Sequence, residues 1–337
     1  KEATGSLNDE ILRNLYDRLM YLRSLNDRKA VVLASIEEQG KLTDELKKQI
    51  EAVMTMVALE DLYRPYRPKR RTRATIAKEK GLEPLAEILR AQATTRTIEE
   101  EATAFVDAEK GVESVQDAID GAKDILAEVY ADDADYRTKL RAMTKESGSL
   151  VAKAKDEEAD SVYEMYYDFS EPIKKLVGHR ILAINRGEAE KFLTVKIEAP
   201  RQEILLWLVK QIIGNMKHDS ASYLYEAITD SYDRLIAPSI EREIRNELTE
   251  KAEEGAIGVF GKNLHQLLMQ PPISGQVVLG WDPGFAHGSK LAVVDETGKV
   301  LDTVIIYPTK GQKNYDAAKQ VLKKLIAKYH VTLISLG

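Results

Sequence analysis

The sequence predicts a mainly α protein, in which an elongated helical region with a small β-hairpin is followed by an incomplete α/β domain. Three observations support this fold class. Apolar residues recur at helical spacing through most of residues 1–270. Charged residues make up 31% and hydrophobic residues 44% of the 337 positions, a balance typical of long exposed helices over packed cores. From Gln276 onward, short apolar runs separated by turn residues indicate strands.

Residues 1–146 are predicted to form an N-terminal helical region. Leucine and isoleucine repeat at helical spacing before Gly40, which is expected to end a helix, and Thr43 can cap the next one. Pro65 and Pro68 then interrupt the pattern. Further short helices are expected at residues 82–92, 97–108, 112–130 and 133–146.

Residues 147–272 are predicted to form a helical connecting region that contains the hairpin. The expected strands are Ile181–Ile184 and Phe192–Ile197, joined through "NRGEAE". An amphipathic or buried helix follows Pro200, and Pro238 is expected to divide the next helical region in two.

Residues 273–337 are predicted to form the incomplete α/β domain. Three expected strands are followed by a helix and a fourth strand, in the order βββαβ. The predicted bounds are 277–281, 291–294 and 300–307 for the strands, 314–329 for the helix and 331–336 for the last strand.

Composition narrows the possible functions. The chain has no cysteine, which excludes disulfides and thiolate metal sites and fits an intracellular setting. No apolar run approaches the length of roughly 20 residues that a membrane span needs. The five histidines have no metal-ligand spacing, so we predict neither a metal site nor a cofactor. Because the chain starts at Lys1 and stops at the end of a predicted strand, we interpret it as part of a longer protein.

The stretch from Arg64 to Lys80 is the local candidate for nucleic-acid binding. It has eight basic residues and one acidic residue, although the net charge of the chain is −6. Arginines can bind phosphate with two hydrogen bonds, and Tyr63 and Tyr66 could stack on bases. Alternatively, these arginines pair with the acidic helices of residues 94–168, a region that contains twenty acidic and nine basic residues. The candidate phosphate-binding residues are Arg64, Arg67, Lys69, Arg70, Arg71, Arg73 and Lys78.

Asp282 is the candidate for catalysis. It ends the first predicted strand of the α/β domain, in "LGWDPGF", beside a Pro-Gly turn. Two-metal nucleases hold their ions with several carboxylates, and one of these can lie at such a strand end. A single carboxylate binds a metal weakly, so the favoured interpretation is that Asp282 caps its own turn.

Three long motifs give the chain a family resemblance. They are "ALEDLYRPYRPKRRTRATIAKEKGLEPLA", "HRILAINRGEAE" and the stretch from "PSIEREIRNEL" through "QPPISGQVVLGWDPGF" to "KLAVVDETGKVLDT". Together they resemble bacterial Tex-type transcription accessory proteins over essentially the whole chain. The resemblance implies a cytoplasmic nucleic-acid-binding protein with helix-turn-helix-like segments within residues 147–272. It also implies that the last domain is the first part of a YqgF domain with a ribonuclease-H-like fold, whose fourth strand lies beside the first and parallel to it.

The sequence and the resemblance together predict a non-enzymatic scaffold that binds nucleic acid, RNA rather than DNA, and that serves transcription without contacting a membrane. Two alternatives remain open. One is a divalent-metal nuclease or resolvase centred on Asp282. The other is a module that docks to the transcription machinery through its acidic helices.

Overall fold

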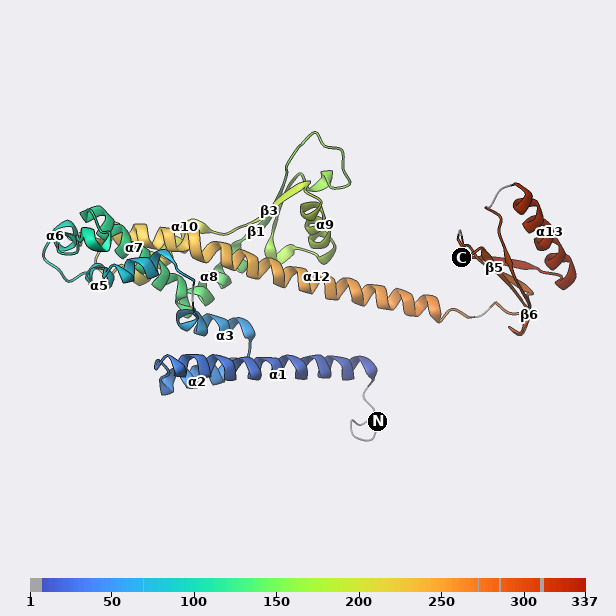
Figure 1. The fold of residues 1–337 in the computed structure, drawn as a ribbon, viewed down its shortest axis with the longest axis horizontal. Helices are drawn as coiled ribbons and strands as arrows, with labels where there is room; N and C mark the ends of the chain where they lie inside the picture. Colours follow the sequence, from blue (N-terminus) through green and yellow to red (C-terminus); the bar gives the residue numbers. More distant parts are fainter. Residues whose placement is uncertain (1–7, 69, 272, 285, 310–311) are drawn as a thin grey trace. The chain divides into compact units, whose positions relative to one another are not determined.

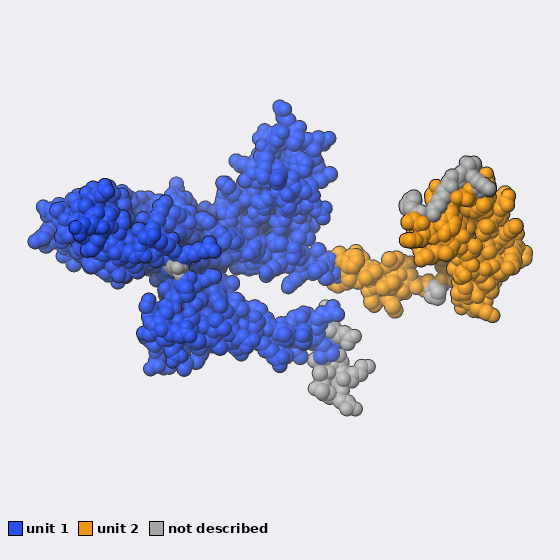
Figure 2. All heavy atoms as spheres, in the orientation of Figure 1, with its two compact units in different colours: residues 1–258 blue, residues 259–337 orange. Residues whose placement is uncertain are grey.

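A computed structural model describes residues 8–337 apart from residues 69, 272, 285, 310 and 311. The chain divides into two compact units, residues 1–258 and residues 259–337 (Figure 2). Helices dominate the first unit, and a four-stranded sheet with one helix makes up most of the second (Figure 1). The prediction of a mainly α protein with a partial α/β domain is confirmed.

The first helices pack around a small apolar cluster of their own. Thr43 caps the second of them by accepting a hydrogen bond from the Leu46 amide at 3.2 Å, as predicted, and Gly40 takes a left-handed conformation just before it. Leu25, Ile50 and Leu59 are buried between the helices. These helices are α1 (Asp9–Glu38), α2 (Asp44–Ala52) and α3 (Met56–Tyr63).

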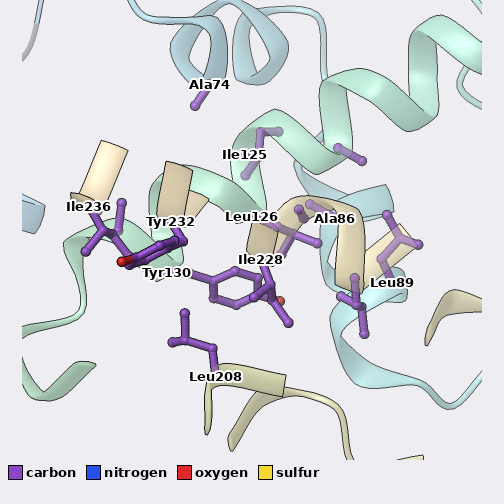
Figure 3. Packing of buried hydrophobic residues seen from close by; sticks show 14 of the residues in the cluster. Ala74, Ala86, Leu89, Ile125, Leu126, Tyr130, Leu208, Ile228, Tyr232 and Ile236 are labelled. Atoms are coloured by element: carbon purple, nitrogen blue, oxygen red, sulfur yellow. The ribbon is translucent and has the colours of Figure 1, made fainter. Parts of the chain in front are cut away.

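The main core of the first unit is built around α7 (Val115–Asp132), which has eight buried residues. Figure 3 shows side chains of α7 packed against those of its neighbours, among them Leu208 and Ile228. The surrounding helices are α4 (Arg73–Glu79), α5 (Glu83–Ala91), α6 (Ile98–Thr103), α8 (Ala134–Ser147), α10 (Arg201–Ile212) and α11 (Ser220–Asp230). Short 3-10 turns, η2 (Arg64–Tyr66) and η3 (Ala108–Lys110), connect some of them.

A three-stranded antiparallel sheet replaces the predicted hairpin. The strands β1 (Ser149–Ala154), β2 (Asp168–Pro172) and β3 (Leu193–Glu198) pair in the order β2-β1-β3. Only the second of the two predicted strands exists, as β3. The segment predicted as the first strand lies in the helix α9 (Gly178–Ala189), so that prediction was wrong. The turns η4 (Glu164–Tyr166) and η5 (Ile173–Lys175) flank β2.

The helical conformation of α9 follows from which residues are buried. Ile181, Ile184 and Gly187 recur every three positions and face the same side. Gly187 permits close packing there, because a Cβ at that position would lie 2.7 Å from the Leu193 Cδ1. A short apolar run does not by itself distinguish a strand from a buried helix, and the packing of this face decides for the helix.

Pro238 does not divide the helical region as predicted. α11 continues into a π-helical segment, η6 (Ser231–Ile236), and then directly into α12 (Ala237–Leu268). Proline lacks an amide hydrogen and disturbs the usual hydrogen-bond pattern one turn earlier. The π-helical segment lies at that position, and such local rewinding lets a helix continue past an irregularity.

The second unit contains the predicted βββαβ order. The strands β4 (Val278–Asp282), β5 (Ser289–Val294) and β6 (Val300–Ile306) are antiparallel, and β7 (Leu333–Leu336) pairs parallel to β4 after the helix α13 (Gln312–Tyr329). The resulting strand order β6-β5-β4-β7 is the one that the resemblance implies. Buried residues of the sheet, such as Leu279 and Val293, pack with Ala318 and Leu325 of α13.

Candidate nucleic-acid interface

The connector, which we define as residues 64–72, joins α3 to α4. Pro65 stabilises the single turn of η2 because its ring fixes φ near the helical value. The chain becomes extended at Arg67. Thr72 then caps α4 and donates a hydrogen bond to Glu128 on α7 at 2.9 Å, which ties the end of the connector to the main core.

The connector borders a cleft of about 700 Å³ in the first unit. Side chains from α3, α4, α7, η6 and α12 complete its walls. The charged residues that line it are Glu60, Asp61, Arg64, Arg67, Arg70, Arg73, Asp124, Glu128, Asp132, Arg234 and Glu243.

The acidic side chains of the cleft are all engaged. Glu60 pairs with Arg28 at 2.7 Å, and Asp124 lies 3.4 Å from Arg234. Glu128 accepts the hydrogen bond from Thr72, and Asp132 also has a partner. Asp61 and Glu243 form ion pairs with Arg137 and Arg141. The acidic side chains of the cleft therefore have partners already in place, and for Glu60, Asp61, Asp124 and Glu243 these partners are arginines.

The basic residues of the connector differ in how free they are. Arg67 and Arg70 are exposed, and among the described residues their side chains have neither an ion-pair nor a hydrogen-bond partner. Arg71 pairs with Glu79 at 2.9 Å, and Lys78 pairs with Glu83 at 3.1 Å. Arg67 and Arg70 are thus the connector arginines best placed to bind a phosphate group.

Two further candidates lie beside these arginines. Arg73 is exposed at the start of α4, and its charge acts on Asp124 across the cleft. Lys69, also predicted to bind phosphate, lies outside the described residues. The cleft therefore contains both kinds of arginine that the sequence suggested. Some lie near acidic residues of α7, and others have no partner within the described part of the chain.

Arg64 lies at the inner end of the connector. Its Nη2 donates a hydrogen bond to the Ser239 hydroxyl at 3.2 Å. Burial lowers the pKa of the Arg64 guanidinium, and the nearby positive charge of Arg137 lowers it further. Arg64 is therefore a partly desolvated cation beside a second cation.

Beneath the cleft lies an ionic network that was not predicted from the sequence; its members are Asp61, Arg137, Arg141 and Glu243. The Arg137 side chain is fully buried; its Nε lies 2.8 Å from Asp61 Oδ1 and its Nη2 lies 2.6 Å from Glu243 Oε1. Arg141 also binds both carboxylates, each at 2.8 Å. The network joins α3, α8 and α12.

A local signal for this network exists on α8. Arg137 shares a buried face with Leu140 and Thr144, at helical spacing. A charged residue on the apolar face of a helix predicts a buried partner, because an isolated buried charge is very costly.

Asp282 ends β4, which lies between β5 and β7 in the sheet. Its side chain is exposed, and among the described residues none donates a hydrogen bond to it. The predicted capping of its own turn is therefore not seen. An open hollow of about 820 Å³ adjoins it, lined also by Lys290, Thr303 and Ser335.

Neither a metal centre nor a membrane span is found in the described part of the chain. No group of three or more histidine, aspartate or glutamate side chains there is arranged to hold a metal ion. No described helix is both long and apolar enough to cross a membrane.

Comparison with family models decides the relationship. Residues 93–260 match the Tex central region, and residues 276–337 match the Tex protein YqgF-like domain. The chain belongs to the Tex family. In this Tex-family chain the second match covers all four strands of the sheet.

Curated relatives agree with this assignment over the whole length of the Tex-family chain. The "Transcriptional accessory protein Tex" of Neisseria gonorrhoeae is 41% identical over 345 residues, and the uncharacterized protein YdcI of Bacillus subtilis is 46% identical over 340. The human "S1 RNA-binding domain-containing protein 1" is 31% identical over 352 residues. The chain spans 44%, 47% and 35% of these relatives, respectively, which is less than half of each.

Proposed function

We propose that this chain is a non-enzymatic, nucleic-acid-binding part of a transcription accessory protein, and that it binds RNA through the connector. The observation that carries the proposal is that Arg67 and Arg70 have no partner among the described residues and lie beside a cleft whose acidic groups are engaged. The names of two relatives support a role in transcription and in RNA binding, since one is called a transcriptional accessory protein and the other is named for an RNA-binding domain. We place the protein in the cytoplasm as part of the same proposal.

The mechanism is charge neutralisation. A guanidinium donates two parallel hydrogen bonds to phosphate oxygens, and this contact does not depend on the base sequence. Because Arg67 and Arg70 form no ion pair with any described residue, phosphate binding costs mainly the partial desolvation of the two side chains. The ionic network holds α3 in place and so positions the connector that follows it.

Fluorescence anisotropy of a labelled single-stranded RNA tests the proposal. The double variant Arg67→Glu/Arg70→Glu should bind at least about tenfold more weakly, since each hydrogen bond to a charged group contributes roughly 1.5–3 kcal/mol. The matched control is Lys47→Glu/Lys48→Glu, which makes the same change in net charge on the exposed surface of α2. Equal losses in both variants would show a nonspecific charge effect and reject the connector as the site.

A nuclease centred on Asp282 is the second candidate, because this carboxylate ends a strand inside the sheet and adjoins an open hollow. We favour binding over catalysis, since Asp282 is the one acidic side chain among the described residues that line this hollow. Incubation with Mg²⁺ or Mn²⁺ should leave single-stranded RNA and branched DNA intact. Cleavage that is lost in Asp282→Asn would establish the nuclease instead.

A further inference from the structure

The cleft beside Arg67 and Arg70 has an apolar wall that phosphate binding does not use. Val57 on α3 is 46% exposed. Met56 and Leu235 are half-buried on the same cleft, and Ala74 and Ala131 line it more deeply. A groove that served only to hold a phosphate backbone would need positive charge and no exposed apolar wall.

The size of the cleft narrows the choice of ligand. At about 700 Å³ it lies within the range of small-molecule sites, roughly 300–1,000 Å³. A phosphate group alone would leave most of that space empty. A flat ring next to an anion matches both parts of the lining, and a nucleotide has this combination.

We propose that the cleft binds one nucleotide unit, with its base against Val57, Met56 and Leu235 and its phosphate at Arg67 and Arg70. This inference rests on the proposed function for the phosphate contacts and extends it by naming what enters the cleft. The unit can belong to a single strand or be a free nucleoside monophosphate. In duplex RNA or DNA, a base is stacked and paired and does not reach an apolar wall.

Among the described residues, the charges at the inner end of the cleft balance. The guanidiniums of Arg64 and Arg137 donate to the same Ser239 hydroxyl, at 3.2 and 3.0 Å. Two positively charged side chains therefore contact the same hydroxyl group. Arg141 is a third cation there, and three carboxylates oppose these cations: those of Asp61 and Glu243 in the network and that of Asp132, whose charge acts on Arg64. The phosphate contact of the proposal therefore rests on Arg67 and Arg70 in the connector.

Calorimetric titration of the whole chain with uridine monophosphate, uridine and inorganic phosphate tests the inference. The monophosphate should bind about tenfold more tightly than inorganic phosphate, because the base buries apolar surface against Val57, Met56 and Leu235. Val57→Gln should remove most of this advantage and leave the binding of inorganic phosphate unchanged. The control is Met54→Gln, since Met54 is also exposed but does not line the cleft. Equal affinity for the monophosphate and inorganic phosphate, or no effect of Val57→Gln, would overturn the inference.

Binding of a single-stranded oligonucleotide and of its duplex separates the two sources of the nucleotide. If the unit belongs to a strand, Val57→Gln should weaken the single strand about tenfold and leave the duplex unaffected. If only the free monophosphate binds, the nucleotide site stands and the proposed RNA-binding function fails. If the oligonucleotide binds in a salt-dependent way but the monophosphate gains nothing over phosphate, the RNA-binding function stands and the nucleotide site fails.

Discussion

Arg137 and Arg141 on α8 have side chains only 0% and 12% exposed, whereas Arg67 and Arg70 in the connector are exposed. Both buried guanidiniums bind two carboxylates each, and Arg137 also binds a hydroxyl. Arg67 and Arg70 have no such partners among the described residues. Burial makes pairing obligatory, because an unpaired charge away from water is very costly. Exposure removes that requirement and leaves the charge free for a ligand.

This difference in burial predicts opposite effects on stability and on binding. Substitutions in the ionic network should destabilise the fold and affect nucleic-acid binding only through the fold. Substitutions at Arg67 and Arg70 should weaken binding and leave the fold intact.

The largest expected effect is that of Arg137→Met on stability. Removing this guanidinium leaves Asp61 and Glu243 with one arginine instead of two, and breaking a buried ion pair costs roughly 3–5 kcal/mol. Urea unfolding followed by circular dichroism measures the change. Adding Asp61→Asn should cost less than the sum of the two single changes, because the two residues interact directly. Strict additivity would contradict a coupled network.

A smaller effect should appear in the pH dependence of stability. Burial acts to raise the pKa of Glu243, but the hydrogen bond from Arg141 and the charge of Arg137 outweigh it and lower the pKa below the ordinary value of 4.5. A carboxylate with a lowered folded pKa contributes stability above its unfolded pKa, and this contribution is lost as the pH falls through the folded value.

The variant Glu243→Gln tests this linkage. It should be less stable than the wild type at pH 7, and the difference should shrink as the pH falls below 4.5. Unfolding curves in urea at several pH values give the difference directly. A gap that stays constant down to acidic pH would mean that Glu243 acts by packing and not by charge.

The smallest expected effect is that of Arg71→Gln. The pair Arg71–Glu79 is exposed, at 70% and 59% for the two side chains, and such pairs contribute roughly 0–1 kcal/mol. Arg70→Gln should likewise leave the stability nearly unchanged. If either change approached the cost of Arg137→Met, exposure would not be what separates the two groups of arginines.

Local signals in the sequence were sufficient to predict many of the helices and strands. Thr43 and Gly40 marked a helix start and a helix end through hydrogen bonding and backbone conformation, which depend on near neighbours. The change of period after Gln276, together with the family resemblance, predicted the order of strands in the second unit. The basic connector was also recognised from its composition.

Features that depend on distant residues were not predictable in the same way. The prediction of a hairpin was wrong because contact with Leu193 and Tyr163, and not the apolar run alone, defines the buried face of α9. The ionic network joins residues 61, 137, 141 and 243, and no local pattern pairs positions so far apart. For the same reason, composition could not tell which basic residues of the stretch are paired and which are free.

The salt dependence of RNA binding tests the central claim most directly. For a single strand, log K falls with log salt by about 0.7 for each phosphate contact. The slope for Arg67→Gln/Arg70→Gln should therefore be shallower than that of the wild type by about 1.4, with an unchanged unfolding midpoint in urea. An unchanged slope in that variant, with the fold intact, would show that the free arginines of the connector do not bind phosphate.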